Sequence, residues 1–441
     1  MNTIKTVLTN TFMLAVVIVI IFTGCKKNDA TNTGQTTQQN GNNNKVPVIT
    51  LPDTTMFAGV TIADSNKIAI YALSATNGSV ITRYTYPRDA QSTWFMPFAG
   101  NGFLYDVESD KINAINMNTG VIQWTDSVKN NSTTILHNDV FYGVSNANTT
   151  SAYVYAIDAT KQSNNLLWKY QLNTTTYYPA YLNYYNGAIY LSNASNNSTS
   201  GNLLVLDAKA GTLKWSSNKS CTLSSLTNGL IISGSAFLDP ATGNQIGQVP
   251  ASALVPNSYQ IIPSVVYANN SMFFTTLNMS PSYSMESLEI NAYDRATGAS
   301  KWSINGGSNY QSLSVDSIKT ILQAWNNQPF IQIVNGTTPT AHSGLVSSIS
   351  YGVLDSNTGQ LKWSILIGSD YQNQFIIVNN TLYAYVTMSA LNGYSYVPSG
   401  GGAVAVDMYS GKQKWVYQTT LGNSFNICVF AAGKGYSPYI Q

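Results

Sequence analysis

The sequence predicts an all-β fold: an eight-bladed β-propeller of four-stranded antiparallel blades, with seven blades as the alternative. One phrase recurs eight times, consisting of an apolar pair, an aspartate, a short turn that ends on glycine, and a tryptophan four residues later. Its clearest copies are 206–215 (LDAKAGTLKW), 293–302 (YDRATGASKW) and 354–363 (LDSNTGQLKW). The turns between Gly78 and Gly411 lie about 48 residues apart on average, which is typical of propeller blades. Short β-rich runs separate them, and no stretch after the N-terminal segment keeps a helical period.

Residues 1–24 are predicted to be a lipoprotein signal peptide. Lys5 supplies a sparse positive charge, and 12–22 (FMLAVVIVIIF) is an apolar run too short to span a bilayer comfortably as a helix. The order FTGC at 22–25 is similar to a bacterial lipobox, in which a cysteine after a small residue is acylated. We therefore expect Cys25 to be the site of lipid attachment, with palmitate as an acyl group. The alternative is a buried free cysteine in an N-terminal helix.

The remaining chain divides into a tether and a folded body. Residues 25–50 are predicted to be a lipid-anchored flexible linker, because their polar composition cannot offset the entropy of ordering them. Residues 51–441 are predicted to form the propeller. Cys221 and Cys428 lie in distant repeats, so we expect two buried thiols rather than a disulfide.

Three positions of the phrase are expected to have structural roles. An aspartate that opens a tight turn can accept hydrogen bonds from backbone N–H groups, and glycine takes the positive φ at the end of the turn. A tryptophan on the outgoing strand is expected to dock blade against blade, with its N–H on a carbonyl. The alternative is an aromatic sugar-binding platform in every blade. The predicted turn residues are Asp158, Asp207, Asp239, Asp294, Asp355, Asp407, Gly120, Gly211, Gly243, Gly298, Gly359 and Gly411, and the predicted docking residues are Trp124, Trp168, Trp215, Trp302, Trp363 and Trp415.

Some copies depart from the phrase. The first has Ser74 in the aspartate position and Tyr84 near the tryptophan position, and the second has Asn116 for the aspartate. The third lengthens its turn over 161–165, and the fifth has Gly247 where the tryptophan belongs. These departures are interpreted as ordinary drift between blades.

The pattern Ala-x-Asp-x-x-Thr-Gly-x-x-x-Trp resembles the tryptophan-docking repeat of pyrroloquinoline-quinone-like (PQQ-like) β-propellers. This superfamily includes quinoprotein alcohol dehydrogenases and BamB-like outer-membrane assembly lipoproteins. The resemblance extends from residue 60 to residue 441 and implies eight blades. It also implies a closing blade in which 426–440 supplies inner strands and 60–86 completes the sheet. Such closure removes open sheet edges.

The residues needed for quinoprotein chemistry are missing from the sequence. Those dehydrogenases use adjacent cysteines, a calcium held by carboxylate and amide oxygens, and an aspartate base. This chain has no adjacent cysteines, and its only glutamates are Glu108, Glu286 and Glu289. Its only histidines, His137 and His342, are far apart in sequence, which argues against a zinc site. We therefore expect no enzyme activity, no cofactor and no metal.

Charge excludes another class of function. Charged residues make up 9% of the chain and the formal net charge is +2, too little to attract nucleic acid electrostatically.

Three Tyr-rich insertions, 173–185, 277–287 and 391–402, have the composition of binding loops. They could equally be solvated connections with half-buried tyrosines. The candidate binding residues are Tyr177, Tyr178, Tyr181, Tyr283, Tyr394 and Tyr396.

Two functions follow. The first is a non-catalytic scaffold for protein–protein interaction in the bacterial envelope, with outer-membrane protein assembly as its specific form. The second is a surface lipoprotein that binds polysaccharide or another extracellular ligand. The expected location is the outer membrane facing the periplasm, with the cell surface as the alternative. The expected partners are the membrane, through the lipid anchor, and an envelope protein or a glycan.

Overall fold

The computed structural model describes one compact unit of the chain, and every described residue lies within 37–441. No helix in this described part is long and apolar enough to cross a membrane. The signal peptide and most of the predicted linker, including Cys25, lie outside the described residues. The described residues are 49, 51–62, 67–87, 96–108, 110–128, 131–145, 152–161, 165–172, 179–193, 203–218, 221, 223, 226, 229–233, 235–249, 259–261, 265–279, 285–308, 318–335, 348–368, 375–392, 395–419, 425–431 and 434–436.

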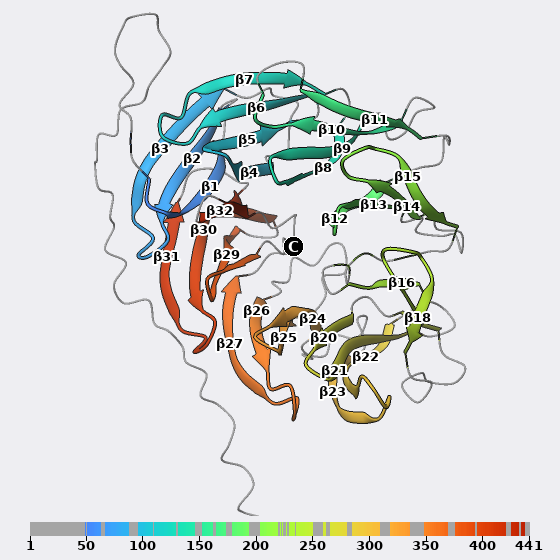
Figure 1. The fold of residues 1–441 in the computed structure, drawn as a ribbon. Helices are drawn as coiled ribbons and strands as arrows, with labels where there is room; N and C mark the ends of the chain where they lie inside the picture. Colours follow the sequence, from blue (N-terminus) through green and yellow to red (C-terminus); the bar gives the residue numbers. More distant parts are fainter. Residues whose placement is uncertain are drawn as a thin grey trace, which may run out of the picture. The chain divides into compact units, whose positions relative to one another are not determined.

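Within this unit the strands form eight antiparallel sheets, one for each copy of the phrase, and each sheet is one blade (Figure 1). This confirms the predicted eight-bladed propeller rather than the seven-bladed alternative. Blades are numbered from 1 to 8 in chain order. Seven blades have a described inner strand: β4 (Met96–Gly100), β8 (Asn131–His137), β12 (Pro179–Tyr185), β20 (Val265–Ala268), β24 (Ile318–Trp325), β28 (Phe375–Val378) and β32 (Phe425–Ala431).

In these seven blades the second strand pairs antiparallel with the inner strand. The second strands are β1 (Thr54–Ile62), β5 (Phe103–Val107), β9 (Val140–Ser145), β13 (Ala188–Asn193), β16 (Ile231–Ser233), β21 (Ser271–Met279), β25 (Gln328–Asn335) and β29 (Thr381–Asn392).

The third strand of each blade leads into the repeated aspartate turn. The third strands are β2 (Lys67–Ser74), β6 (Lys111–Asn116), β10 (Tyr153–Asp158), β14 (Leu203–Asp207), β17 (Ala236–Leu238), β22 (Met285–Asp294), β26 (Ser348–Leu354) and β30 (Ser395–Asp407).

The outer strand of each blade follows that turn and carries the tryptophan position. The outer strands are β3 (Val80–Pro87), β7 (Ile122–Ser127), β11 (Leu166–Gln171), β15 (Leu213–Ser217), β18 (Gln245–Gln248), β23 (Ser300–Ser308), β27 (Leu361–Gly368) and β31 (Gln413–Thr419).

In three blades the number of described strands is not four. Blade 5 contains three strands in the part of the chain that is described, β16, β17 and β18. Blade 6 gains β19 (Tyr259–Ile261), and blade 1 gains β33 (Lys434–Tyr436) beside β32.

Blade 1 closes the ring because it combines strands from both ends of the folded body. Its order is β3-β2-β1-β32-β33, and Thr54 of β1 pairs with Ala431 of β32. The C-terminal part of the chain therefore supplies the inner strand, as the family resemblance implied. Closure thereby joins the two ends of the folded body in one sheet.

The core lies between blades. Eight clusters of buried apolar residues each join two neighbouring blades, and together they account for every seam around the ring. At the closing seam, Tyr383 and Trp415 of blade 8 pack with Tyr71 and Ile427 of blade 1. Cys221 and Cys428 are both buried, outside any disulfide and in different clusters, as expected for two separate thiols.

A second repeated turn joins the innermost strand of a blade to the second strand. It is an Asn-Gly, Asn-Asp or Asn-Asn dipeptide in which both residues have positive φ, the requirement of a type I′ hairpin. The dipeptides are Asn101-Gly102, Asn138-Asp139, Asn186-Gly187, Asn326-Asn327 and Asn379-Asn380. The sequence analysis missed this turn, although its Asn-Gly and Asn-Asn pairs recur with the blade period.

The two kinds of turn lie at the same end of each blade. The N–H of Ala208, just after Asp207, donates to the carbonyl of Gly187 (3.0 Å), and Met408 donates in the same way to Asn380 (3.0 Å). We call this side of the disc the turn face. Strands alternate in direction, so every other connection leaves at the opposite side, which we call the connection face.

Candidate functional site

The repeated aspartates are used by the turns. Asp294 Oδ1 accepts hydrogen bonds from the backbone N–H groups of Ala296 (3.0 Å) and Thr297 (2.9 Å) and from the Thr297 hydroxyl (3.0 Å). These bonds, led by the Thr297 N–H, hold the pKa of Asp294 below its usual value. Asp158, Asp207, Asp239, Asp355 and Asp407 accept equivalent bonds in their own turns.

A lysine before the tryptophan has a role that the sequence analysis did not assign. Each outer strand has a bulge at this position, as between Val205 and Leu206 opposite Lys214. The lysine ammonium lies near the turn aspartate: Lys301 Nζ is 3.7 Å from Asp294 Oδ2, and Lys362 Nζ is 3.8 Å from Asp355 Oδ2. Such exposed pairs contribute little stability, but a bulge and a charge both protect an outer strand from pairing with another chain.

The tryptophans make the joint between blades. The Trp363 indole N–H donates to the carbonyl of Met408 in the next blade (2.9 Å), and a Cβ placed on Gly411 would lie 2.6 Å from the same indole. The turn glycine is therefore needed for two reasons, its positive φ and the ring that covers it. The same bond joins Trp168 to Ala208, Trp215 to Pro240, Trp302 to Ser356 and Trp415 to Ala75.

Three seams use other residues. Tyr84 takes the tryptophan position in blade 1, and its hydroxyl donates to the carbonyl of Met117. At the seam after Trp124, the hydroxyl of Tyr105 donates to the carbonyl of Ala159 (3.1 Å). At the seam after Gly247, the ring of Phe237 meets the edge of the Tyr267 ring in the next blade, with centroids 6.4 Å apart. Docking is thus a general property of the seams and leaves the indoles poorly placed as sugar platforms.

The two histidines are not brought together in the described structure. His137 stacks on Tyr184 of the next blade, with ring centroids 3.6 Å apart and 19° between the planes. Burial lowers the pKa of His137. His342 lies outside the described residues. In the described part of the chain, no group of three or more His, Cys, Asp or Glu side chains could hold a metal ion.

Each of the three Tyr-rich segments includes a junction between strands at the connection face. That junction joins β11 to β12 within 173–185, β21 to β22 within 277–287, and β29 to β30 within 391–402. β12 itself runs across the blade and ends at Tyr185, beside the Asn186-Gly187 turn of the turn face. Each junction is a connection between an outer and an inner strand or between a second and a third strand. The topology therefore brings junctions from three blades to one side of the disc.

Parts of these segments are strands, where loops were expected. Tyr181 lies in β12 opposite Ser192, and Tyr396 lies in β30 opposite Leu391. The other four candidates, Tyr177, Tyr178, Tyr283 and Tyr394, lie outside the described residues. A role of all six in binding stays a prediction.

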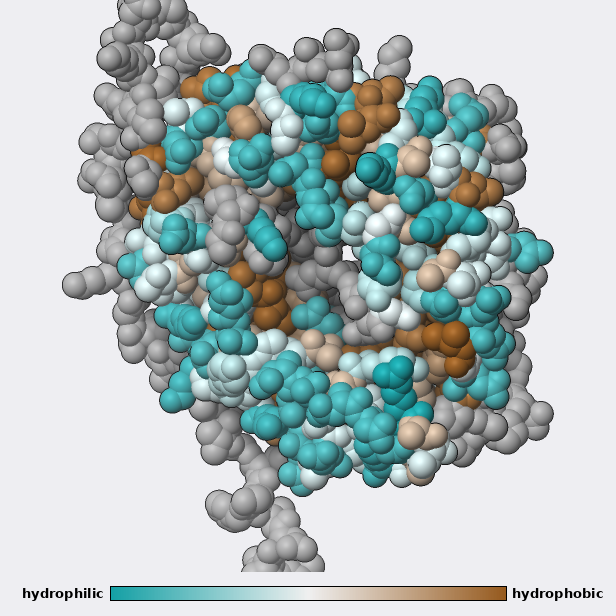
Figure 2. Space-filling model, viewed as in Figure 1, coloured by the Kyte–Doolittle hydropathy of each residue, from teal (hydrophilic) through white to brown (hydrophobic). Residues whose placement is uncertain are grey.

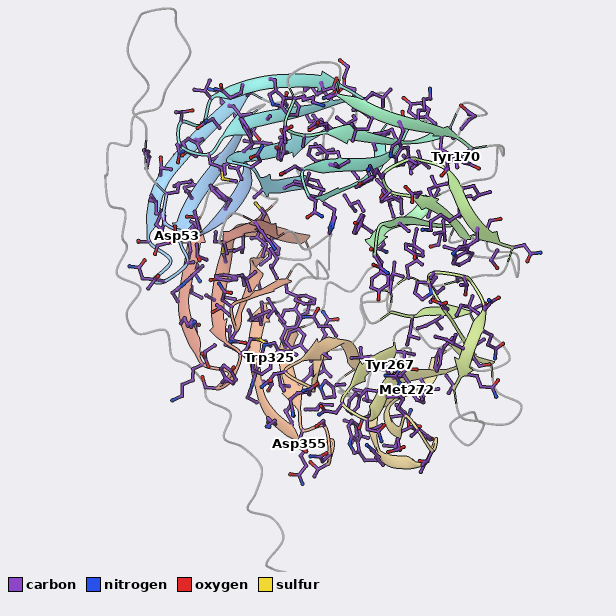
Figure 3. The ribbon with its side chains drawn as sticks, in the orientation of Figure 1. Asp53, Tyr170, Tyr267, Met272, Trp325 and Asp355 are labelled. Atoms are coloured by element: carbon purple, nitrogen blue, oxygen red, sulfur yellow. The ribbon has the colours of Figure 1, made fainter. Side chains whose placement is uncertain are left out.

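The turn face carries an aromatic pair in which one ring is exposed and the other is partly buried. Trp325, at the end of β24, meets Tyr409 in the aspartate turn of blade 8, with ring centroids 4.9 Å apart and an interplanar angle of 69°. The side chain of Tyr409 is 63% exposed. Figure 3 shows Trp325 closer to the centre of the ring than Asp355, which lies in the turn of blade 7. This pair was not predicted from the sequence because its members are far apart in the chain.

Exposed aliphatic residues at the rim are scattered. Figure 2 shows apolar areas separated by polar ones over the described surface in this view. Val80, Ile122, Leu213 and Leu361 each begin an outer strand, and each is exposed in a different blade. Single exposed aliphatic residues are normal on a soluble surface and do not define a site.

The ring of eight blades, with tryptophan docking at most of its seams, makes the described part of the chain a β-propeller. Residues 233–428 match the family model described as outer membrane protein assembly factor BamB. A comparison with curated proteins finds no match.

Solved structures give three examples of similar chains. Apo AztD from Citrobacter koseri is 11% identical, with 87% of this chain and 99% of that chain covered and a TM-score of 0.48. Quinohemoprotein alcohol dehydrogenase ADHIIG from Pseudomonas putida HK5 is 11% identical, with 79% and 73% covered and a TM-score of 0.43. A europium-containing methanol dehydrogenase is 14% identical, with 65% and 71% covered and a TM-score of 0.34.

The described residues do not fit a quinone–calcium centre. Cys221 packs between blades 4 and 5, whereas Cys428 packs between blades 1 and 2, so they cannot act as an adjacent pair. Glu108 accepts a hydrogen bond from Asn113 Nδ2 (3.0 Å) and pairs with Lys111 (3.5 Å). The repeated aspartates bind their own turns. No catalytic step through a quinone is derived from this donor set.

Proposed function

We propose that the protein is a membrane-anchored, non-catalytic scaffold of the bacterial envelope whose connection face binds a protein partner. The proposal rests on one observation: the residues of the repeated phrase have structural roles, whereas the connection face carries the Tyr-rich junctions. The repeated Asp, Gly and Trp residues stabilise turns and seams, while each of the three Tyr-rich segments includes a strand junction at the connection face. Tyrosine with Ser, Asn and Gly provides rigid contact area at a low entropic cost.

Its specific form is a role in outer-membrane protein assembly. The match of 233–428 to the BamB family model supports this role, because it covers blades 6, 7 and 8 and most of blade 5. The predicted acylation of Cys25 and the polar linker 25–50 would hold the propeller beside a membrane. The proposed location is the outer membrane facing the periplasm.

Site-specific crosslinking in intact cells tests the scaffold. A photo-reactive residue at position 181 or 396 on the connection-face side is expected to capture an envelope protein, identified by mass spectrometry. The same residue at Lys209 or Asn357, both in exposed aspartate turns, is the matched control for the turn face. Capture from the turn positions alone would contradict the assignment of faces. Recovery of a barrel-assembly component would support the specific role.

The non-catalytic part of the proposal has its own test. The purified protein, supplied with calcium and pyrroloquinoline quinone, is expected to show neither bound quinone absorbance nor dye-linked alcohol oxidation. Alcohol oxidation in this assay would contradict the proposal that the protein is non-catalytic.

The second candidate is polysaccharide binding, with the protein at the cell surface. The Trp325–Tyr409 pair favours it, because an exposed ring beside a second ring offers an apolar face for a sugar. Titration of glycans while indole fluorescence is recorded, with Tyr409→Ala as the variant, tests this function. Surface labelling of intact cells separates it from the periplasmic scaffold.

A further inference from the structure

The N-terminal end of the folded body is bound at the turn face. The backbone N–H of Ile49 donates to the carbonyl of Asn118 (3.1 Å), which lies in the repeated turn of blade 2. Leu51 packs against the apolar cluster that joins blades 1 and 2. The Thr55 hydroxyl then donates to the carbonyl of Pro52 (3.1 Å), where the chain enters the first strand. These contacts hold the chain at the seam between blades 1 and 2.

The direction of β1 leads to the same place. Thr55, near the start of β1, pairs with Ser74 at the end of β2, and β2 ends at the turn face. Ile62, at the other end of β1, pairs with Lys67 at the start of β2. The chain that precedes β1 therefore meets the propeller on the turn face, and the predicted linker leaves the folded body there.

The two turns beside this exit contain no carboxylate. Ser74 in blade 1 and Asn116 in blade 2 occupy the position that is aspartate in the other six copies of the phrase. Asn116 Oδ1 accepts bonds from the N–H groups of Asn118 (2.9 Å) and Thr119 (3.1 Å), as an aspartate does in the other blades. The neutral side chain thus keeps the turn and removes its negative charge. Asp53, which precedes β1, keeps an exposed carboxylate on the chain at this exit.

The length of the linker relates the exit to a membrane. Residues 25–48 lie between the predicted anchor and Ile49, and a random coil of this length has an r.m.s. end-to-end distance of about 25 Å. To place the connection face against the bilayer, the linker would also have to run along the rim for about 20 Å, the length of the six-residue strand β7. That path uses most of the reach and restricts the conformations of the linker.

We propose that the turn face of blades 1 and 2 is the surface that the protein presents to the membrane, and that it faces a layer of anionic phospholipid headgroups. An anionic surface repels carboxylates, so neutral turns suit this position. The connection face then points away from the bilayer, and its partner is a protein domain in the aqueous phase. The inference rests on the proposed lipid anchor and defines where the partner of the proposed scaffold lies.

Energy transfer from the propeller to labelled lipid tests the orientation. The acylated protein is reconstituted in vesicles of phosphatidylethanolamine and phosphatidylglycerol that carry an acceptor dye on their headgroups. The donor dye is attached to an azido amino acid at position 76, in the turn of blade 1, or at position 127, at the connection-face end of β7, both of which are exposed. Because β7 separates the two faces, transfer is expected to be about twofold higher from position 76. Equal transfer, or higher transfer from position 127, would overturn the orientation.

Two matched variants test the chemistry of the surface. Ser74→Asp/Asn116→Asp restores the carboxylates and is expected to lower transfer from position 76 in the anionic vesicles but not in phosphatidylcholine vesicles. Ala241→Asp/Asn357→Asp adds the same charge to exposed positions in the turns of blades 5 and 7 and is expected to leave transfer unchanged. Unchanged transfer in the first variant would overturn the anionic surface as the partner of these turns.

Flotation of the vesicles separates this inference from the proposed anchor. Equal transfer from both positions, in a protein that floats with the vesicles, would overturn the orientation and leave the anchor standing. If the protein does not float, Cys25 is coupled to a maleimide lipid, which supplies the same tether, and transfer is measured again. Higher transfer from position 76 in that sample would support the orientation although the natural anchor has failed, and equal transfer would overturn it.

Discussion

The indole N–H of Trp415 donates a hydrogen bond of 2.8 Å to the carbonyl oxygen of Ala75, 340 residues earlier in the chain. Trp415 lies in blade 8 and Ala75 follows the third strand of blade 1, so this bond crosses the seam that closes the ring. Trp168, Trp215, Trp302 and Trp363 make the same bond at seams between consecutive blades. The closing seam is thus joined by the same contact as the seams that the chain forms locally.

Trp415→Phe is expected to lower the free energy of unfolding by about 1–3 kcal/mol. The substitution removes the donor to the Ala75 carbonyl while it keeps most of the buried ring. Urea unfolding followed by fluorescence measures the change, and Tyr409→Phe, which alters an exposed hydroxyl, is the control. Equal stability of Trp415→Phe and the wild type would contradict a contribution of the bond to closure.

Gly359→Ala is expected to destabilise the protein more than Gly298→Ala. Both glycines have nearly the same positive φ, 71° and 69°, so the backbone cost of alanine is similar at both. A Cβ at Gly359 would also lie 2.8 Å from Trp302, whereas the blade before Gly298 has Gly247 in the tryptophan position. Overpacking of this kind costs about 1–3 kcal/mol in addition. Thermal unfolding of the two variants compares them, and equal losses would show that only φ matters.

Stability is expected to fall as the pH drops below about 4. The N–H groups of Asn357 and Thr358 hold the pKa of Asp355 below its usual value, and the Ser410 hydroxyl does the same for Asp407. A carboxyl whose pKa is lower in the folded state contributes stability above the pKa of the unfolded chain and loses it as the pH falls through the folded value. The urea midpoint from pH 3 to 6 should therefore decline toward acid in the wild type.

The variant Asp294→Asn/Asp355→Asn/Asp407→Asn provides the comparison for this titration. Asparagine can accept the same turn bonds but does not titrate, so the midpoint should depend less on pH. If the urea midpoint of this variant falls toward acid as steeply as that of the wild type, groups other than these three aspartates cause the loss of stability.

Cys25→Ser is expected to abolish fatty-acid labelling of the protein in cells. The predicted lipobox places the acyl chain on this thiol. Metabolic labelling with radioactive palmitate measures attachment, and Cys221→Ser is the control because that thiol is buried in the seam between blades 4 and 5. Continued labelling of Cys25→Ser would remove the lipid anchor from the proposed function.

The fold was predictable because the residues that specify its turns and outer strands are close together in sequence and recur along the chain. Asp207, Gly211 and Trp215 lie within nine residues, and each copy of this phrase specifies a turn and the outer strand that follows. Blade number and the closing blade then follow from the count of copies and the family resemblance.

The candidate site was less predictable because it depends on contacts between distant residues. Trp325 and Tyr409 meet only because two blades are neighbours. Residues 391–402 contain Gly, Ser and Pro and were expected to form a loop, yet cross-strand pairing of Leu391 with Tyr396 extends two strands through them. Strand length is decided by the partner strand as well as by local composition.

Closure through β32 also has a consequence for the order of folding. β1 can pair with β2 early in synthesis, but its other edge meets Phe425–Ala431, which the ribosome adds only after the seven intervening blades. Blade 1 must therefore hold an open edge throughout translation and any export that accompanies it. A contact between such distant segments forms slowly, so a chaperone that binds β1 would shield the nascent chain until its last partner arrives.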